Sequence, residues 1–138
     1  MHFALETDIR GKARPRFTRR GIAYKDARDE AYEEAIVWAY RAAGGRETGW
    51  TGEVSVTIRT NRKLPKSTRK SVESEPDTHK PDADNIAKSV LDALNGIAWK
   101  DDAQITKLVI WKLPRARREK ELLEVEIEYG GIQDGINE

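Results

Sequence analysis

Hydrophobic and polar residues alternate in four stretches of the chain, at residues 2–7, 54–59, 105–113 and 123–129. This pattern is typical of β-strands that bury one face and expose the other, because successive side chains of a strand point to opposite sides. In the last stretch a glutamate follows each of the first three hydrophobic residues, which predicts one face in water. The sequence therefore predicts about four strands.

Two other stretches carry hydrophobic residues at the spacing of an α-helix. Between residues 25 and 43, alanine, isoleucine and aromatic residues recur every three or four positions, and two glycines follow as a natural end. A second helix is predicted from about Asp84 to Asn95, with Gly96 after it. Its core residues gather on one side of a helical wheel, and Asp84, Lys88 and Asn95 gather on the other.

The order strand, helix, strand, helix, strand, strand predicts an α/β (α+β) fold, with a mixed sheet of about four strands covered by two helices. Residues 1–130 are predicted to form a single domain, and residues 131–138 a frayed C-terminal tail. Residues 10–20 predict an extended loop or ribbon, because glycine and proline interrupt them. Residues 61–80 predict a long loop without regular structure, and loops of this length are usually functional or mobile.

The composition excludes several kinds of chemistry. The chain has no cysteine, which rules out disulfides, zinc–thiolate sites and a cysteine nucleophile. Oxygen ligands and hard cations are therefore the natural candidates for metal chemistry. The longest apolar run, Ala35–Tyr40, is far shorter than the roughly 20 residues that span a membrane. Residues 1–11 lack the pattern of a signal peptide, so we expect an intracellular, cytoplasmic protein.

Charge is strongly segregated, although the net charge is only +1. Basic residues with almost no acidic ones fill Arg10–Arg20, Arg59–Lys70 and Lys112–Lys120. These runs are either three solvated loops or one basic surface for a polyanion such as DNA. The residues predicted to contact DNA are Lys12, Arg14, Arg16, Arg62, Lys63, Lys66, Arg69 and Lys70.

The candidate active site lies where the second helix begins. Asp82 and Asp84 stand at a loop-to-helix junction, where extended backbone lets Asp82 fold back towards Asp84, and Lys88 follows one turn later. The helix dipole favours anions at this end. Asp101 and Asp102 follow the helix after a return short enough to bring a third carboxylate back to the pair. Three such carboxylates would form a hard oxygen site for Mg²⁺ that activates a phosphodiester and a water molecule.

Each of these residues also has an interpretation in which it has only a local structural role. Asp82 could be an N-cap, Asp84 and Lys88 an exposed ion pair worth about 0.3–0.5 kcal/mol, and Asp101-Asp102 a turn. The combination, more than any single residue, favours the catalytic interpretation.

The string Asp82-x-Asp84-Asn85-x-x-Lys88, followed by Trp99-Lys-Asp-Asp-Ala-Gln104, resembles the core signature of the RusA-type Holliday-junction resolvases. The basic stretch from Lys12 to Phe17 is similar to that of their phage and prophage branch. The resemblance implies that Asp82, Asp84 and Asp102 bind the metal and that Lys88 is the catalytic lysine. It also implies a bacterial or phage-encoded homodimer that nicks two opposed strands of a four-way DNA junction with Mg²⁺ or Mn²⁺.

Two alternatives stay open, a nuclease for other branched or flapped DNA and a non-catalytic nucleic-acid-binding module. Two symmetric nicks need two-fold symmetry, and we expect the dimer contact near Trp111 or Leu123. Phe17 is predicted either to stack on bases or to anchor the basic ribbon to the core. His79 is interpreted as an exposed loop residue, and Trp99 and Trp111 as core or dimer-contact aromatics.

Overall fold

The computed structural model describes residues 1–12, 16–24, 26–47 and 49–131, and every structural statement refers to these residues. The elements along the chain are β1 (His2–Glu6), β2 (Arg16–Phe17), β3 (Ala23–Tyr24), α1 (Ala27–Ala42), β4 (Val54–Asn61), β5 (Ser74–Glu75), α2 (Ala83–Leu94), η1 (Asp102–Gln104), β6 (Ile105–Lys112), β7 (Arg115–Ala116) and β8 (Leu122–Tyr129). The predicted α+β fold is confirmed, with four long strands and two helices at the expected places.

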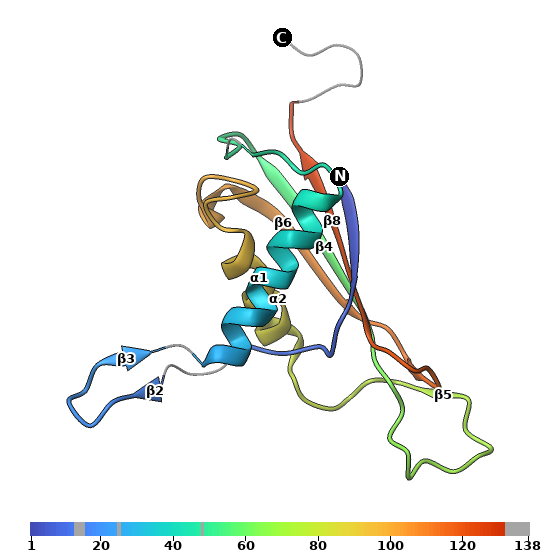
Figure 1. The fold of residues 1–138 in the computed structure, drawn as a ribbon. Helices are drawn as coiled ribbons and strands as arrows, with labels where there is room; N and C mark the ends of the chain where they lie inside the picture. Colours follow the sequence, from blue (N-terminus) through green and yellow to red (C-terminus); the bar gives the residue numbers. More distant parts are fainter. Residues whose placement is uncertain (13–15, 25, 48, 132–138) are drawn as a thin grey trace.

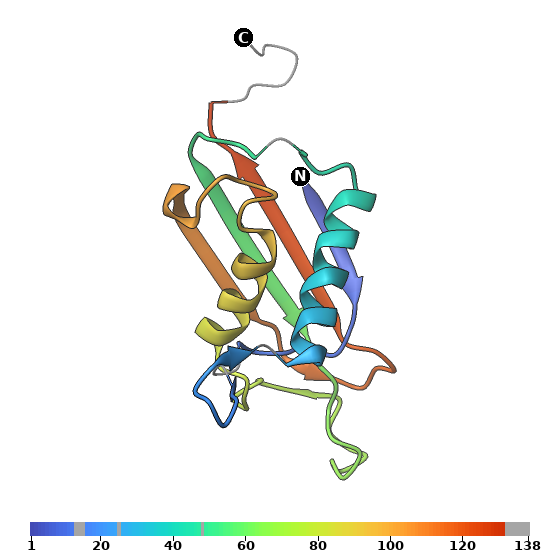
Figure 2. The same cartoon turned by 60° about the vertical axis from the view of Figure 1, so that its left-hand side comes forward.

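The four long strands form one mixed sheet in the order β1-β8-β4-β6. β4 and β6 are parallel, and β8 is antiparallel to both of its neighbours. Helix α2 forms the crossover between β4 and β6, so it runs back along the sheet from the end where β4 finishes (Figure 2). Both helices cover the same face of the sheet (Figure 1). The start and the end of α2 therefore point towards opposite ends of the sheet (Figure 2).

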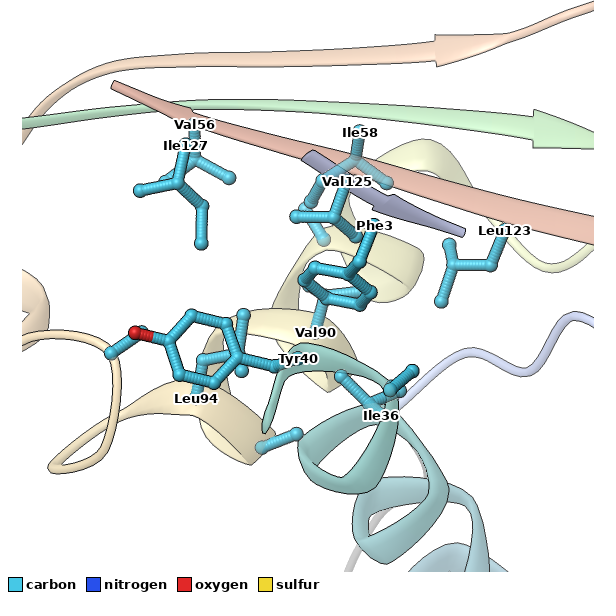
Figure 3. Close-up of a cluster of buried hydrophobic side chains, with 14 of the residues drawn as sticks. Phe3, Ile36, Tyr40, Val56, Ile58, Val90, Leu94, Leu123, Val125 and Ile127 are labelled. Atoms are coloured by element: carbon cyan, nitrogen blue, oxygen red, sulfur yellow. The ribbon is translucent and has the colours of Figure 1, made fainter. Parts of the chain in front are cut away.

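The core lies between the sheet and the helices. Val56 and Ile58 of β4 and Val125 of β8 are fully buried and point from the sheet towards Ile36 of α1 and Val90 of α2 (Figure 3). Burying a side chain of this kind contributes about 1.5–3 kcal/mol. Alternate residues of the same strands lie on the other face, which no helix covers. The binary pattern of the sequence thus fixes which face of the sheet carries the helices.

The structure differs from the predictions in two places. The stretch after β4 is not structureless, because β5 within it pairs with β7. Leu123 is fully buried in the core and is therefore not a surface residue for a dimer contact, whereas Trp111 is 54% exposed on the open face of the sheet. The predicted tail, apart from Gly131, lies outside the described residues. None of the helices in the described part of the chain is long and apolar enough to cross a bilayer.

Candidate active site and nucleic-acid interface

Helix α2 begins with two acidic residues that face solvent. Asp82 occupies the N-cap position in extended backbone, with φ −68° and ψ 152°, and Asp84 lies in the first turn. The Asp82 side chain makes no capping hydrogen bond to the helix, although capping is the usual local role of an aspartate at this position. Both carboxylates lie at the positive end of the helix dipole. They are therefore available to a cation at the helix start.

A lysine fixes the backbone just before these aspartates. Lys112, at the end of β6, donates from Nζ to the carbonyl oxygens of His79 at 2.6 Å and Pro81 at 2.9 Å. Its ammonium is also 3.9 Å from the carboxylate of Asp77, whose side chain is fully buried. Arg62 contacts the same carboxylate at 3.2 Å. Asp77 thus lies between two cations, and the loop that leads into α2 is tied to β6.

The beginning of the first basic run crosses the start of α2. The backbone N–H of Lys12 donates to the carbonyl oxygen of Asn85 at 2.9 Å. A Cβ added to Gly11 would lie 2.7 Å from the Cβ of Pro81. Glycine is therefore required at position 11 if the two chain segments are to pack this closely. The N-terminal part of the chain is held directly beside the candidate site.

An exposed stripe of charged residues continues along α2 from Asp84. Lys88 is exposed one turn further on, and Asp92 lies one turn beyond Lys88. The Lys12 ammonium lies 2.7 Å from Asp92 and 3.6 Å from Glu33 of α1. Hydrogen bonding to Asp92 raises the pKa of Lys12 above its usual value, although partial burial opposes the shift. Lys12 therefore ties the two helices together, which differs from the free cation predicted for DNA contact.

Asp102 opens η1, beyond the end of α2. Its Oδ1 accepts a 2.7 Å hydrogen bond from the indole N–H of Trp99, a residue that is fully buried. Burial raises the pKa of the Asp102 carboxyl, the Trp99 hydrogen bond lowers it, and the charges of Asp92 and Asp101 raise it again. The net effect is a raised pKa. Trp99 thus orients one oxygen of a carboxylate whose charged form is disfavoured first by burial and then by repulsion from its neighbours.

Asp101 and Gln104, which lie on either side of Asp102 in the sequence, stabilise the turn. Asp101 and Gln104 form a reciprocal capping box around η1, in which Gln104 Oε1 accepts from the backbone N–H of Asp101 at 2.7 Å. The Gln104 amide also donates to the carbonyl oxygens of Trp50 at 2.6 Å and Gly52 at 2.7 Å. The interpretation as a turn residue therefore holds for Asp101. Asp102 is the acid of the pair that the turn does not use.

One chain does not bring the three carboxylates together. Asp82 and Asp84 lie at the start of α2 and Asp102 follows its end, and the 12 residues of the helix separate these ends by about 18 Å. The described residues contain no group of three acidic or histidine side chains that could hold a metal ion. The short return leads to the far end because β6 must begin there to pair in parallel with β4. A three-carboxylate metal site therefore does not fit a single chain.

The predicted DNA contacts separate into three groups. Four of them, on the loop after β4, are exposed: Lys63, Lys66, Arg69 and Lys70. Lys12 and Arg62 are instead turned towards carboxylates within the chain. Arg14 and the side chain of Arg16 lie outside what the structure describes. Figure 1 shows the exposed loop, the β2–β3 hairpin and the start of α2 at the same end of the molecule.

Comparison with known proteins identifies the family. A family model described as endodeoxyribonuclease RusA matches residues 6–128, nearly the whole chain. The chain belongs to the RusA endodeoxyribonuclease family. The uncharacterized protein YqaN from Bacillus subtilis (strain 168) is 32% identical in an alignment of 111 residues, and the match covers 73% of this chain and 78% of that relative. Membership of the RusA family implies Holliday-junction resolvase activity, a nuclease function with branched DNA as the substrate.

The RusA match spans α2 and η1, so all the predicted active-site residues lie within it. The structure gives positioning roles to three residues to which the sequence analysis assigned none. Trp99 holds Asp102, Gln104 fixes the turn that carries it, and Lys112 holds the backbone before Asp82. Their signal in the sequence was weak, because Trp99 reads as an ordinary core aromatic and Lys112 as one member of a basic run.

Proposed function

We propose that this RusA-family nuclease is a metal-dependent, structure-selective enzyme that resolves four-way junctions by paired nicking. Asp82, Asp84 and Asp102 are the proposed ligands of Mg²⁺, which Mn²⁺ can replace, and Lys88 is the proposed catalytic lysine. The observation that carries the proposal is the exposed, uncapped pair of carboxylates at the start of α2. These carboxylates lie at the same end of the molecule as the exposed cations of the loop after β4 (Figure 1).

The position of Asp102 supports a site built from two chains. When α2 of one copy lies antiparallel to α2 of a second copy across a two-fold axis, the start of each helix faces the end of the other. Asp82 and Asp84 then meet Asp102 of the partner subunit. Such a homodimer contains two equivalent sites, as two opposed nicks require. This contact uses the helix layer instead of the strand surface predicted around Trp111.

The residues of the composite site have distinct tasks. Carboxylates are the oxygen ligands that Mg²⁺ and Mn²⁺ prefer, and a bound ion would supply activation of the phosphodiester and of water. The start of α2 attracts the phosphate through the helix dipole. The Lys88 ammonium stabilises negative charge that develops on the phosphate oxygens. Trp99 keeps Asp102 in a fixed direction, as supporting hydrogen bonds do for metal-binding carboxylates.

Substitution of the two neighbouring aspartates tests the ligand assignment. Asp102→Asn keeps the size of the side chain but removes one negative charge, so nicking of an immobile four-way junction in Mg²⁺ should fall about 100-fold or more. Junction binding in Ca²⁺ should stay or tighten, because repulsion of the phosphates decreases. Asp101→Asn is the matched control and should keep most of the activity. Normal cutting by both variants would exclude the carboxylate site, and loss in Asp101→Asn alone would move the ligand by one residue.

Mixing inactive chains tests whether the site is shared. In a mixed dimer of Asp84→Asn and Asp102→Asn chains, one composite site carries both substitutions and the other carries neither. Co-expressed chains with different tags, purified through both tags, should therefore nick one strand of the junction, although each parent variant is inactive. Inactivity of the mixed dimer would show that the site is not shared. Parallel assays on flapped and linear duplexes should show weaker cutting than on the junction.

A further inference from the structure

The β2–β3 hairpin exposes large apolar side chains. Its tip is a tight turn in which Thr18 and Ile22 exchange hydrogen bonds and Gly21 has a φ of +78°. Phe17 is 64% exposed and Ile22 is 62% exposed, so Phe17 does not anchor the ribbon to the core of its own chain. Both strands are only two residues long. A two-stranded hairpin of this size is marginally stable alone in water, and such a cluster of exposed apolar groups marks a contact surface.

A groove between α1 and α2 is lined by apolar and acidic residues, which complement the apolar and basic residues of the hairpin. Its volume is about 570 Å³, and its lining includes Val37 of α1 together with Ala93 and Ile97 from the region of the α2 C-terminus. Trp38, also part of the lining, is 72% exposed. Three glutamates, Glu30, Glu33 and Glu34, and one arginine, Arg41, also line the groove, and Glu33 already contacts Lys12. The lining thus keeps a negative excess beside its apolar residues, which favours an occupant that is both apolar and basic.

The β2–β3 hairpin has that chemistry and, unlike the exposed apolar residues of β6, does not belong to the four-stranded sheet. Its turn carries Arg19 and Arg20, both exposed, between Phe17 and Ile22. DNA is a poor occupant of the groove, because glutamates repel phosphates. The hairpin leaves the body at the end where both helices begin, on the side of the helices that faces away from the sheet (Figures 1 and 2). It therefore overhangs any second copy that packs against the helix layer.

We propose that the groove between α1 and α2 receives the β2–β3 hairpin of a second copy, so that the two chains exchange arms. The inference rests on the antiparallel assembly proposed above. In that assembly the start of α2 in one copy lies beside the end of α2 in the other, where Ala93 and Ile97 line the groove. Phe17 and Ile22 fill the apolar floor, and Arg19 and Arg20 face the glutamates. Each arm thereby holds the partner's Asp102 end close to Asp82 and Asp84.

Because the chain has no cysteine, cysteines introduced by substitution are the only thiols that a cross-linker can join. Ile22→Cys in one tagged chain and Val37→Cys in a co-expressed chain with another tag place one thiol on the hairpin and one in the groove. A short bismaleimide should join the two different chains. The matched control pairs Ile22→Cys with Ala4→Cys, an exposed position on β1, and should give no cross-link. Absence of a product that joins the two differently tagged chains, or an equal yield in the control pair, would overturn the proposal.

Charge reversal tests whether the ionic contact directs the docking. Glu34→Lys should lower the yield of the Ile22–Val37 cross-link several-fold, and adding Arg20→Glu to the hairpin chain should restore it. Equal yields in all combinations would contradict the proposed contact. Light scattering on the same samples distinguishes loss of arm exchange from loss of the dimer. A stable dimer without the cross-link overturns arm exchange alone, whereas a monomer overturns the two-chain assembly as well.

Binding of the hairpin to DNA is the competing outcome. Maleimide labelling of Ile22→Cys without DNA should be several-fold slower than labelling of Ala4→Cys, because the groove covers the hairpin. Equal labelling without DNA, with protection only after junction DNA is added, would assign the hairpin to the nucleic acid and overturn the proposal.

Discussion

A single hydrogen bond from Trp99 separates the two neighbouring aspartates into different roles. Asp101 caps η1, whereas Asp102 receives the indole N–H of a tryptophan that cannot move, because it is fully buried in the core. A buried indole N–H needs a partner, and here the partner is the proposed metal ligand. The tryptophan therefore connects the packing of the core with the direction of the carboxylate that we propose as a metal ligand.

The substitution Trp99→Phe removes this N–H and keeps an aromatic ring in the core. We expect junction nicking to fall about 10- to 100-fold, the usual cost of losing a group that orients a metal ligand. Mn²⁺ affinity, measured by calorimetry, should fall with it, whereas affinity for the junction in Ca²⁺ should change little. Trp111→Phe, on the open face of the sheet, is the control and should leave both unchanged. Unaltered Mn²⁺ binding by Trp99→Phe would mean that Trp99 has a packing role only.

At the residue scale, local sequence patterns predict those features of the site that are set by residues nearby in the chain. Helical periodicity correctly placed Asp84 and Lys88 on one exposed stripe, and the loop-to-helix junction placed Asp82 at the N-cap. The position of Asp102 relative to them depends on the crossover from β4 to β6, which no local pattern encodes. The raised pKa of Asp102 depends on burial of its carboxyl group, which is also set by tertiary packing and not by a local pattern.

At the scale of elements, the segment between β4 and α2 is held by cations in addition to the short pairing of β5 with β7. Arg117 donates to the backbone carbonyl oxygens of Val72 and Arg69. Arg62 and Lys112 both approach the buried Asp77. These contacts link residues far apart in the sequence, so the composition of the segment alone predicted a structureless loop.

Removing the charge of Asp77 should unfold this arrangement. Asp77→Ala leaves two partly buried cations without their carboxylate, and loss of one partner of a buried ion pair costs about 3–5 kcal/mol. Urea denaturation should show this loss in the free energy of unfolding. Glu6→Ala, which breaks the exposed pair of Glu6 with Lys120, is the control and should cost at most about 1 kcal/mol. A similar small loss for Asp77→Ala would show that the segment does not depend on the buried pair.

At the scale of the whole molecule, the residues of the basic runs differ in their surroundings: some are exposed, and others contact carboxylates. Only part of the positive charge lies on the exposed loop after β4, since Lys12 and Arg62 neutralise carboxylates within the chain. Segregated charge therefore predicted a basic surface but not which cations form it. That distinction depends on tertiary packing.

Salt dependence of junction binding measures the cations that contact DNA. Each neutralised phosphate contributes about −0.9 to the slope of log affinity against log salt. Replacing Lys63 and Lys66 by alanine should make the slope less steep by up to about 1.8 per bound chain. Lys107→Ala, an exposed position on β6 at some distance from this loop, should leave the slope unchanged. An unchanged slope for the Lys63 and Lys66 variant would remove this loop from the DNA interface.

The strand order of the sheet also determines at which stage of translation the enzyme can fold. β8 is the last of the described strands to leave the ribosome, yet it lies between β1 and β4. Until it emerges, β1 has no neighbour to pair with, and the face that supports α1 is incomplete. Pairing between strands that are about 120 residues apart in the sequence is a slow step of folding. A nascent chain therefore carries the aspartates of α2 well before it has the sheet that holds them, which delays DNA cutting until synthesis has passed β8.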